Sequence, residues 1–193
     1  MNLDFESPDA LAETEFEGLG MERKSPRHAA VLLPLYRHDG QWNLLYIRRA
    51  EHKDDRHSGQ VAFPGGRTEK SDRDDVATAL REAREEIGLA SEQVRILGRL
   101  RVLHTVSNYL VTPVVATIPW PVPLTPDENE VARVFGIPID WHRRPEHHQV
   151  RVWPGPGHPE ARDVIFFDRY DSEQLWGITA RITLNLLNRI ADQ

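Results

Sequence analysis

The chain has 193 residues, no cysteine, and 30 acidic residues against 24 lysines and arginines, which gives a formal net charge of −6. This composition excludes disulfides and thiolate metal sites, and without a dense Lys/Arg run a nucleic-acid polymer is not an expected partner. No apolar stretch of about 18 residues and no basic segment ahead of an apolar one occurs, so we expect no membrane span, no signal peptide and a cytoplasmic protein.

The N-terminal region differs in composition from the rest of the chain. Residues 1–24 are rich in Asp and Glu, with apolar residues thinly scattered. We therefore expect an N-terminal arm or short helix there, followed by one ordinary domain over residues 25–193. The arm could pack on a neighbouring subunit, so a homodimer is one assembly that the sequence allows.

The domain alternates between expected strands and helices. In chain order, we expect strands at 29–36 and 42–48 joined by a hairpin turn at Asp39-Gly40, a polar loop over 48–58, and a short strand at 61–63. Next come a helix over about 74–87, β-rich segments at 94–103 and 110–118, and an irregular loop at the four prolines of 119–126. An apolar segment over 130–139, an inserted loop or hairpin over 141–160, a strand at 164–170 and an amphipathic helix over 175–190 complete the chain. This order predicts an α/β domain.

The first expected helix carries a cluster of carboxylates. Glu82, Glu85 and Glu86 are spaced i, i+3 and i+4, so they share one helix face. Three like charges on one face suit a hard divalent cation, because such a cation takes oxygen ligands. The opposite apolar stripe consists of Val76, Leu80, Ala83 and Ile87. We expect the stripe to face a core and the carboxylates to face solvent or a cleft. The alternative is an ordinary solvated face paired with Arg81 and Arg84.

A glycine-rich loop precedes this helix. Residues 58–66 read Ser-Gly-Gln-Val-Ala-Phe-Pro-Gly-Gly, a short apolar run that breaks at Pro-Gly-Gly. Glycines at Gly65 and Gly66 would let the backbone approach a ligand closely. Together with the carboxylate helix, this loop predicts a pocket for a metal and a phosphate chain.

The segment from Gly66 to Leu89 resembles the Nudix box. The usual form is Gly-x5-Glu-x7-Arg-Glu-U-x-Glu-Glu-x-Gly-U, with U an apolar residue. Asp72 stands where that form has its first Glu, and eight residues rather than seven separate it from Arg81. The coenzyme A pyrophosphatase branch of the family has the same one-residue expansion. It also carries runs similar to Gly59–Gly66 and to Thr78–Ala83.

One segment departs from that branch. The branch has Leu-Arg-x-His ahead of Gly-Gln-Val, whereas this chain keeps His57 but has Asp54 and Asp55 at the Leu and Arg positions, with Arg56 next to them. The substrate is therefore open between coenzyme A and another nucleoside diphosphate-linked compound, such as a dinucleotide, ADP-ribose or a nucleoside triphosphate. A non-catalytic nucleotide-binding protein of the same fold is a third reading, which the intact carboxylates disfavour.

The resemblance implies a fold, a reaction and a set of site residues. The fold is an α/β/α sandwich around a mixed sheet, and the reaction is attack of water on phosphorus in a small-molecule nucleotide, assisted by Mg²⁺ or Mn²⁺. For coenzyme A the products would be 4′-phosphopantetheine and adenosine 3′,5′-bisphosphate. Glu82 and Glu86 would be metal ligands, and Glu85 would be a further ligand or would orient the water. Arg81 would hold the carboxylates in place.

Other site residues are candidates by their position in the sequence. Glu130 is the leading general base, because many relatives supply an acidic residue from a later loop; the alternative for it is an ordinary solvated acid. The candidate substrate-binding residues lie in or near the glycine loop and are Arg48, Arg49, Arg56, His57, Gln60, Gly65, Gly66 and Arg67.

Overall fold

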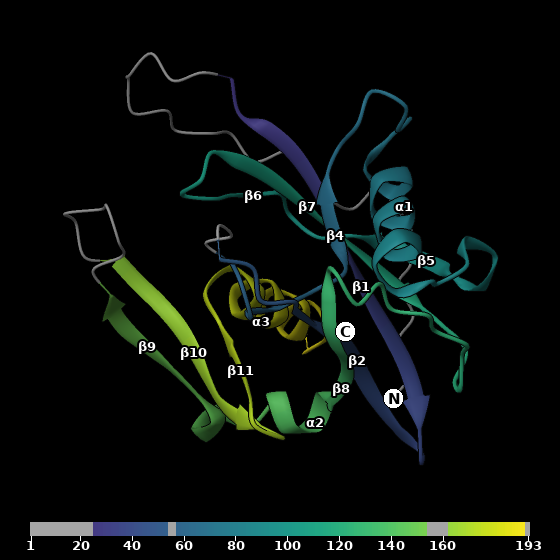
Figure 1. The fold of residues 1–193 in the computed structure, drawn as a ribbon. Coiled ribbons are helices and arrows are strands. Elements are labelled where there is room, and N and C mark those ends of the chain that lie inside the picture. Colours follow the sequence, from purple (N-terminus) through teal and green to yellow (C-terminus); the bar gives the residue numbers. More distant parts are fainter. Residues whose placement is uncertain (1–24, 54–56, 154–161, 192–193) are drawn as a thin grey trace.

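A computed structural model describes residues 25–53, 57–153 and 162–191 (Figure 1). The expected N-terminal arm over 1–24 lies outside these residues, as does Arg56. No helix of the described part is long and apolar enough to cross a membrane.

In the described part of the chain, a mixed sheet of eight strands forms the centre of the molecule. Its main order is β3-β2-β1-β7-β5, while β4 pairs with β1, β6 with β7 and β8 with β2. The strands are β1 (Arg27–His38), β2 (Gln41–Arg49), β3 (Val61–Ala62), β4 (Gly65–Arg67), β5 (Arg95–Arg99), β6 (Leu103–His104), β7 (Tyr109–Thr117) and β8 (Val131–Pro138). β1 runs parallel to β7 and antiparallel to β2 and β4. The expected hairpin is confirmed: Asp39 and Gly40 have φ of 47° and 78°, the left-handed conformation that a tight two-residue turn requires.

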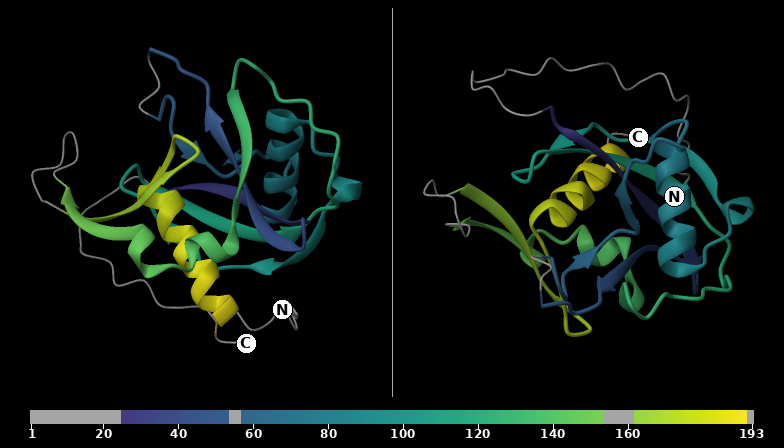
Figure 2. Two further views of the ribbon diagram at one scale, coloured as in Figure 1. Left: turned by 90° about the horizontal axis from the view of Figure 1, so that it is seen from below. Right: turned by 45° about the horizontal axis from the view of Figure 1, so that its top comes forward.

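Helices cover both faces of this sheet (Figure 2). Helix α1 (Asp75–Ile87) packs on one face against Leu32, Leu45 and their neighbours, and helix α3 (Gly177–Ala191) packs on the other against Leu33, Leu35 and theirs. The predicted α/β/α sandwich around a mixed sheet is therefore confirmed. A single-turn helix, α2 (Ile139–His142), lies on the α3 side, and short 3-10 turns occur at Ser91–Gln93 and Pro145–His147.

Helix α1 begins and ends where its sequence predicts. The Asp74 side chain accepts a hydrogen bond from the Ala77 amide at 2.8 Å, and Gly88 ends the helix with φ of 68°. The predicted apolar stripe is wrong at one position. Ala83 and Ile87 are fully buried, but Leu80 is only half-buried, because the helix is rotated so that Ala79 faces the sheet.

The C-terminal third confirms the strand expected at 164–170, which spans Arg162–Tyr170 (β10), and adds a strand at Glu173–Trp176 (β11) that the sequence did not indicate. A second sheet has the order β11-β10-β9, formed by Glu173–Trp176, Arg162–Tyr170 and His148–Trp153. The segment expected as an inserted loop or hairpin thus includes α2 and β9. The predicted helix over 175–190 begins at Gly177 instead, since β11 takes Leu175 and Trp176 and the chain turns at Gly177 with φ of 64°.

A buried polar network joins β2, α2 and α3. The Tyr46 hydroxyl lies 2.9 Å from Nε2 of His142 and 3.0 Å from Oγ1 of Thr183. Nδ1 of His142 lies 3.0 Å from the carbonyl of Pro138, which can only accept, so Nδ1 carries a proton. Burial lowers the pKa of His142 to about 4, so the ring is neutral near pH 7 and Nε2 accepts from the Tyr46 hydroxyl.

Candidate active site

Strand β4 brings glycine backbone directly against the carboxylates of α1. The Gly65 amide donates a hydrogen bond to Oε2 of Glu86 at 2.8 Å. A Cβ on Gly66 would lie 2.6 Å from the Glu82 carboxylate, and one on Gly65 would lie 2.4 Å from the carbonyl of Ala30. Only glycine fits at Gly65, where a Cβ would meet backbone, whereas a Cβ at Gly66 would displace the Glu82 carboxylate.

Of the two surroundings expected for the carboxylates, solvent or a cleft, Glu86 does not face solvent. Its side chain is only 2% exposed, because it points beneath β4 rather than outward. Burial raises the pKa of Glu86 to about 7, and the nearby carboxylates of Glu82 and Glu130 act in the same direction. The Gly65 amide and the Arg49 guanidinium, whose Nη1 lies 3.7 Å from Oε1 of Glu86, oppose that rise. Burial also raises the pKa of Glu82. Two carboxyls of the cluster are therefore costly to ionise without a cation.

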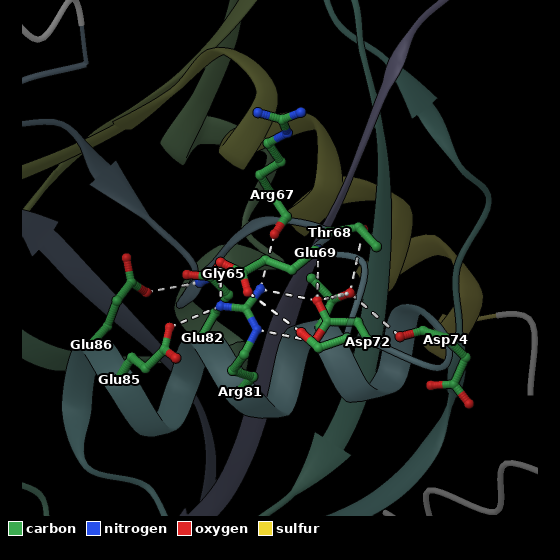
Figure 3. Close-up of polar contacts among 12 residues, drawn as sticks. Gly65, Arg67, Thr68, Glu69, Asp72, Asp74, Arg81, Glu82, Glu85 and Glu86 are labelled. Carbon is green, nitrogen blue, oxygen red and sulfur yellow. Dashed lines mark hydrogen bonds and ion pairs between the residues drawn. The ribbon is translucent and has the colours of Figure 1, made fainter.

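Arg81 connects the glycine strand, the helix and Asp72 (Figure 3). Its Nη1 lies 2.8 Å from Oε2 of Glu85 and 2.9 Å from Oε1 of Glu82, and its Nη2 donates to the carbonyl of Arg67 at 2.9 Å. Its Nε and Nη2 each donate to one oxygen of Asp72 at 3.0 Å. Arg81 therefore pairs with Asp72 in a bidentate manner and also contacts Glu82 and Glu85.

Three residues donate hydrogen bonds to the Asp72 carboxylate. Besides Arg81, the Glu69 amide donates to its Oδ2 at 2.9 Å and the Thr78 hydroxyl donates to the same oxygen at 3.0 Å. The hydrogen bond from Arg81 is the main cause that lowers the pKa of Asp72 to about 2. The contact of Thr78 with Asp72 was not predicted. Its sequence signal is a threonine on the buried side of α1, whose hydroxyl needs a polar partner, six residues after an Asp.

The carboxylate oxygens of Glu82, Glu85 and Glu86 are ligands that suit a hard cation, but in this structure they do not converge on one point. Among the described residues, no three His, Cys, Asp or Glu side chains converge closely enough to ligate a metal as they stand. Arg81 engages Glu82 and Glu85, while one oxygen of Glu86 accepts from Gly65. The Glu85 side chain is 56% exposed, so it can turn without disturbing the core. The residues therefore fit Mg²⁺ or Mn²⁺ once side chains leave Arg81.

Glu130 lies close enough to Glu82 and Glu86 to influence both carboxyls electrostatically. The loop that carries it is anchored at both ends. The Asp127 amide donates to the carbonyl of Glu86 at 3.0 Å, and the carbonyl of Glu130 accepts from the Ala50 amide at 2.8 Å. The Glu130 side chain is exposed. The structure thus places this predicted base beside the cluster on a fixed loop.

The basic residues near the glycine loop fall on different sides of the sheet. Arg49 faces α1 and approaches Glu86, whereas Arg48 faces the α3 side, where its Nε lies 3.9 Å from Glu173. Nδ1 of His57 lies 3.1 Å from Oε1 of Gln60 in a turn whose Gln60 carbonyl accepts from the Arg49 amide. The roles predicted for Arg48, His57 and Gln60 toward a substrate stay predictions.

Comparison with known proteins identifies the family. The family model described as NUDIX domain matches residues 26–166. The chain is 39% identical over 168 residues to the protein named "Uncharacterized Nudix hydrolase NudL" of Pectobacterium atrosepticum, covering 86% of this chain and 84% of that one. A protein of the same name from Yersinia pestis is 35% identical over 167 residues, covering 86% and 80%.

Solved structures show the same fold. A MutT/nudix family protein from Enterococcus faecalis matches with a TM-score of 0.57 at 18% identity, covering 92% of this chain and 66% of that one. A C. elegans Ap4A hydrolase matches with a TM-score of 0.50 at 17% identity, covering 59% and 81%. Nudix hydrolases generally use divalent metals and act on small nucleotide substrates. The chain belongs to the Nudix hydrolase family, whose members act on phosphorus-containing anhydrides.

Proposed function

We propose that this Nudix hydrolase cleaves the diphosphate of coenzyme A, or of its derivatives, to 4′-phosphopantetheine and adenosine 3′,5′-bisphosphate. The observation that carries the proposal is the contact between Asp72 and Arg81. The chain resembles the coenzyme A pyrophosphatase branch in its one-residue expansion of the Nudix box. In the structure the shorter Asp72, with one extra residue before Arg81, still places both carboxylate oxygens 3.0 Å from the guanidinium. With the expanded spacing, Arg81 therefore still pairs with Asp72 while it contacts Glu82 and Glu85.

Glu82, Glu86 and Glu85 would hold a divalent cation, with a backbone carbonyl of Gly65 or Gly66 as a further oxygen ligand. When bound, the cation neutralises charge on the diphosphate oxygens, which otherwise repel an attacking water. Glu130 would take the proton that the water loses. It is suited to this role because its carboxylate is exposed beside the cluster, whereas Glu82, Glu85 and Glu86 would be committed to the cation.

A substrate panel tests the proposal. Coenzyme A, ADP-ribose, a dinucleotide and a nucleoside triphosphate would each be incubated with Mg²⁺ or Mn²⁺, and the products resolved by chromatography. We expect coenzyme A to have the highest kcat/KM, with adenosine 3′,5′-bisphosphate as the nucleotide product. The departure at Asp54 and Asp55 favours a second candidate, a Nudix hydrolase for another nucleoside diphosphate-linked compound, and a higher kcat/KM for one of the other substrates would establish it instead.

A further inference from the structure

We propose that Arg67 and Arg27 form a subsite for a phosphomonoester on the nucleoside half of the substrate, separate from the diphosphate at the carboxylates. This inference deepens the proposed function and rests on it for the identity of the substrate. The two arginines lie on the face of the sheet opposite α1.

The sheet register fixes the position of both side chains. Arg67 pairs with Ala29 across β4 and β1, and Ala29 belongs to the core on the α3 side. Gly66, one residue earlier, faces the Glu82 carboxylate on the α1 side. Because side chains alternate along a strand, Arg67 must point away from the carboxylates, as Figure 3 shows. Arg27 lies two residues before Ala29 on the same strand and face, which makes it a diagonal neighbour of Arg67 at roughly 7 Å between Cα atoms.

Both guanidinium groups lack a carboxylate partner among the residues that the structure describes. Arg67 is exposed, and only its backbone carbonyl is engaged, by Arg81. Cζ of Arg27 lies 4.1 Å from the centre of the Tyr109 ring, and its Nη2 donates to the carbonyl of Ser107 at 3.5 Å. Two positive charges side by side repel each other unless an anion lies between them. Tyr109 belongs to β7, which pairs with β1 on the side away from β4, so an anion bound by both arginines would draw the Arg27 guanidinium from this ring toward Arg67.

The open edge of β4 connects this subsite to the carboxylates. In the described part of the chain β4 pairs with β1 alone, so its other edge is unpaired. Strand geometry puts Cα of Arg67 only about 7 Å from that of Gly65, whose amide holds Glu86. A substrate with two separate anionic groups can therefore straddle β4, with its diphosphate on the α1 side and a second phosphate against Arg67 and Arg27. In coenzyme A that second group is the 3′-phosphate of the ribose.

Binding of two product-like nucleotides tests the subsite without requiring turnover. Adenosine 3′,5′-bisphosphate and 5′-AMP differ only in the 3′-phosphate, and calorimetric titration in Mg²⁺ gives both Kd values. We expect the wild-type protein to bind the bisphosphate about 10- to 100-fold more tightly, the range that a hydrogen bond to a charged group provides. Arg67→Ala with Arg27→Ala should remove this preference and leave the Kd for 5′-AMP nearly unchanged, while Arg67→Lys should retain part of it.

Arg95→Ala is the matched control. Arg95 is also an exposed arginine at a strand end, but it lies opposite Thr117, whereas Arg27 lies opposite Tyr109. These two positions on β7 are eight residues apart, or roughly 26 Å. The control should keep the wild-type preference. Equal Kd values for the two nucleotides in the wild-type protein, or a preference that survives in the double variant, would overturn the proposal.

Kinetics separate failure of the subsite from failure of the proposed function. Coenzyme A and 3′-dephospho-coenzyme A should differ in KM for the wild-type enzyme, and the double variant should make their KM values equal. If coenzyme A is not hydrolysed but the bisphosphate still binds preferentially through Arg67 and Arg27, the proposed substrate is wrong and the subsite stands.

Discussion

Replacing Glu86 with Gln should make the metal-free protein more stable at pH 8 while nearly abolishing its activity. Burial raises the pKa of Glu86 to about 7 from an ordinary value of 4.5. The unfolded chain releases this proton near pH 4.5, but the folded protein keeps it until about pH 7. The stability of the wild-type protein therefore falls as pH rises through that window. A difference of about 2.5 pKa units corresponds to roughly 3 kcal/mol above pH 7.

Glutamine removes that cost and keeps the main local contact, because its carbonyl can still accept from the Gly65 amide. We expect Glu86→Gln to unfold in urea with up to about 3 kcal/mol more stability than wild type at pH 8, and with a difference of only about 1 kcal/mol at pH 5. Mg²⁺ should then raise the melting temperature of the wild-type protein more than that of the variant. Loss of a cation ligand should lower kcat/KM by at least about 10²-fold.

The control for this experiment is Glu85→Gln on the same helix. Its side chain is 56% exposed, so we expect little change in unfolding free energy at either pH. The reasoning is refuted if Glu86→Gln turns over substrate within a few-fold of wild type at saturating Mg²⁺. It is also refuted if the stability difference between Glu86→Gln and wild type is the same at pH 5 and pH 8.

Three further changes give separate outcomes. Glu130→Gln should lower kcat and kcat/KM together by about 10²- to 10⁴-fold and leave the calorimetric Mg²⁺ affinity intact; a fall in that affinity would make Glu130 a ligand instead. Gly66→Ala should lower kcat/KM by about 10-fold or more, since its Cβ would lie 2.6 Å from the Glu82 carboxylate; turnover equal to wild type would contradict this contact. Tyr46→Phe should cost about 1–3 kcal/mol in urea unfolding because Nε2 of His142 loses its donor; an unchanged midpoint would show that water replaces the hydroxyl.

The fold and the position of the carboxylates were predictable because they depend on local patterns. Asp39-Gly40 specifies its own turn, and Asp74 and Gly88 delimit α1 through contacts within a few residues. The Gly-Gly pair comes shortly before the helix that carries the carboxylates, and this order brings β4 against Glu82 and Glu86. These interactions are short in sequence and follow from stereochemistry, so a single sequence contains them.

The features that were not predictable depend on contacts between distant segments. The burial of Glu86 follows from the way β4 covers it, whereas helical periodicity alone predicted only that it would face solvent or a cleft. The assignment of Arg49 to the carboxylates and Arg48 to Glu173 depends on which face of β2 meets α1. Likewise, Leu175 and Trp176 belong to β11 rather than to the expected helix, because β11 pairs with β10 and Trp176 lies opposite Phe166. Tertiary pairing overrides local propensity in each case.

The family match ends at residue 166, but the hydrophobic interior does not. Helix α3 begins eleven residues later, and its Ala180, Ile182, Leu186 and Ile190 fill the side of the sheet that holds Leu33 and Leu35. Thr183 of the same helix completes the hydrogen bonds of Tyr46. A chain truncated after residue 166 would retain every carboxylate of the Nudix box and lose the layer that shields the opposite face of its sheet. The smallest autonomous folding unit of this protein is therefore larger than the segment that defines its family.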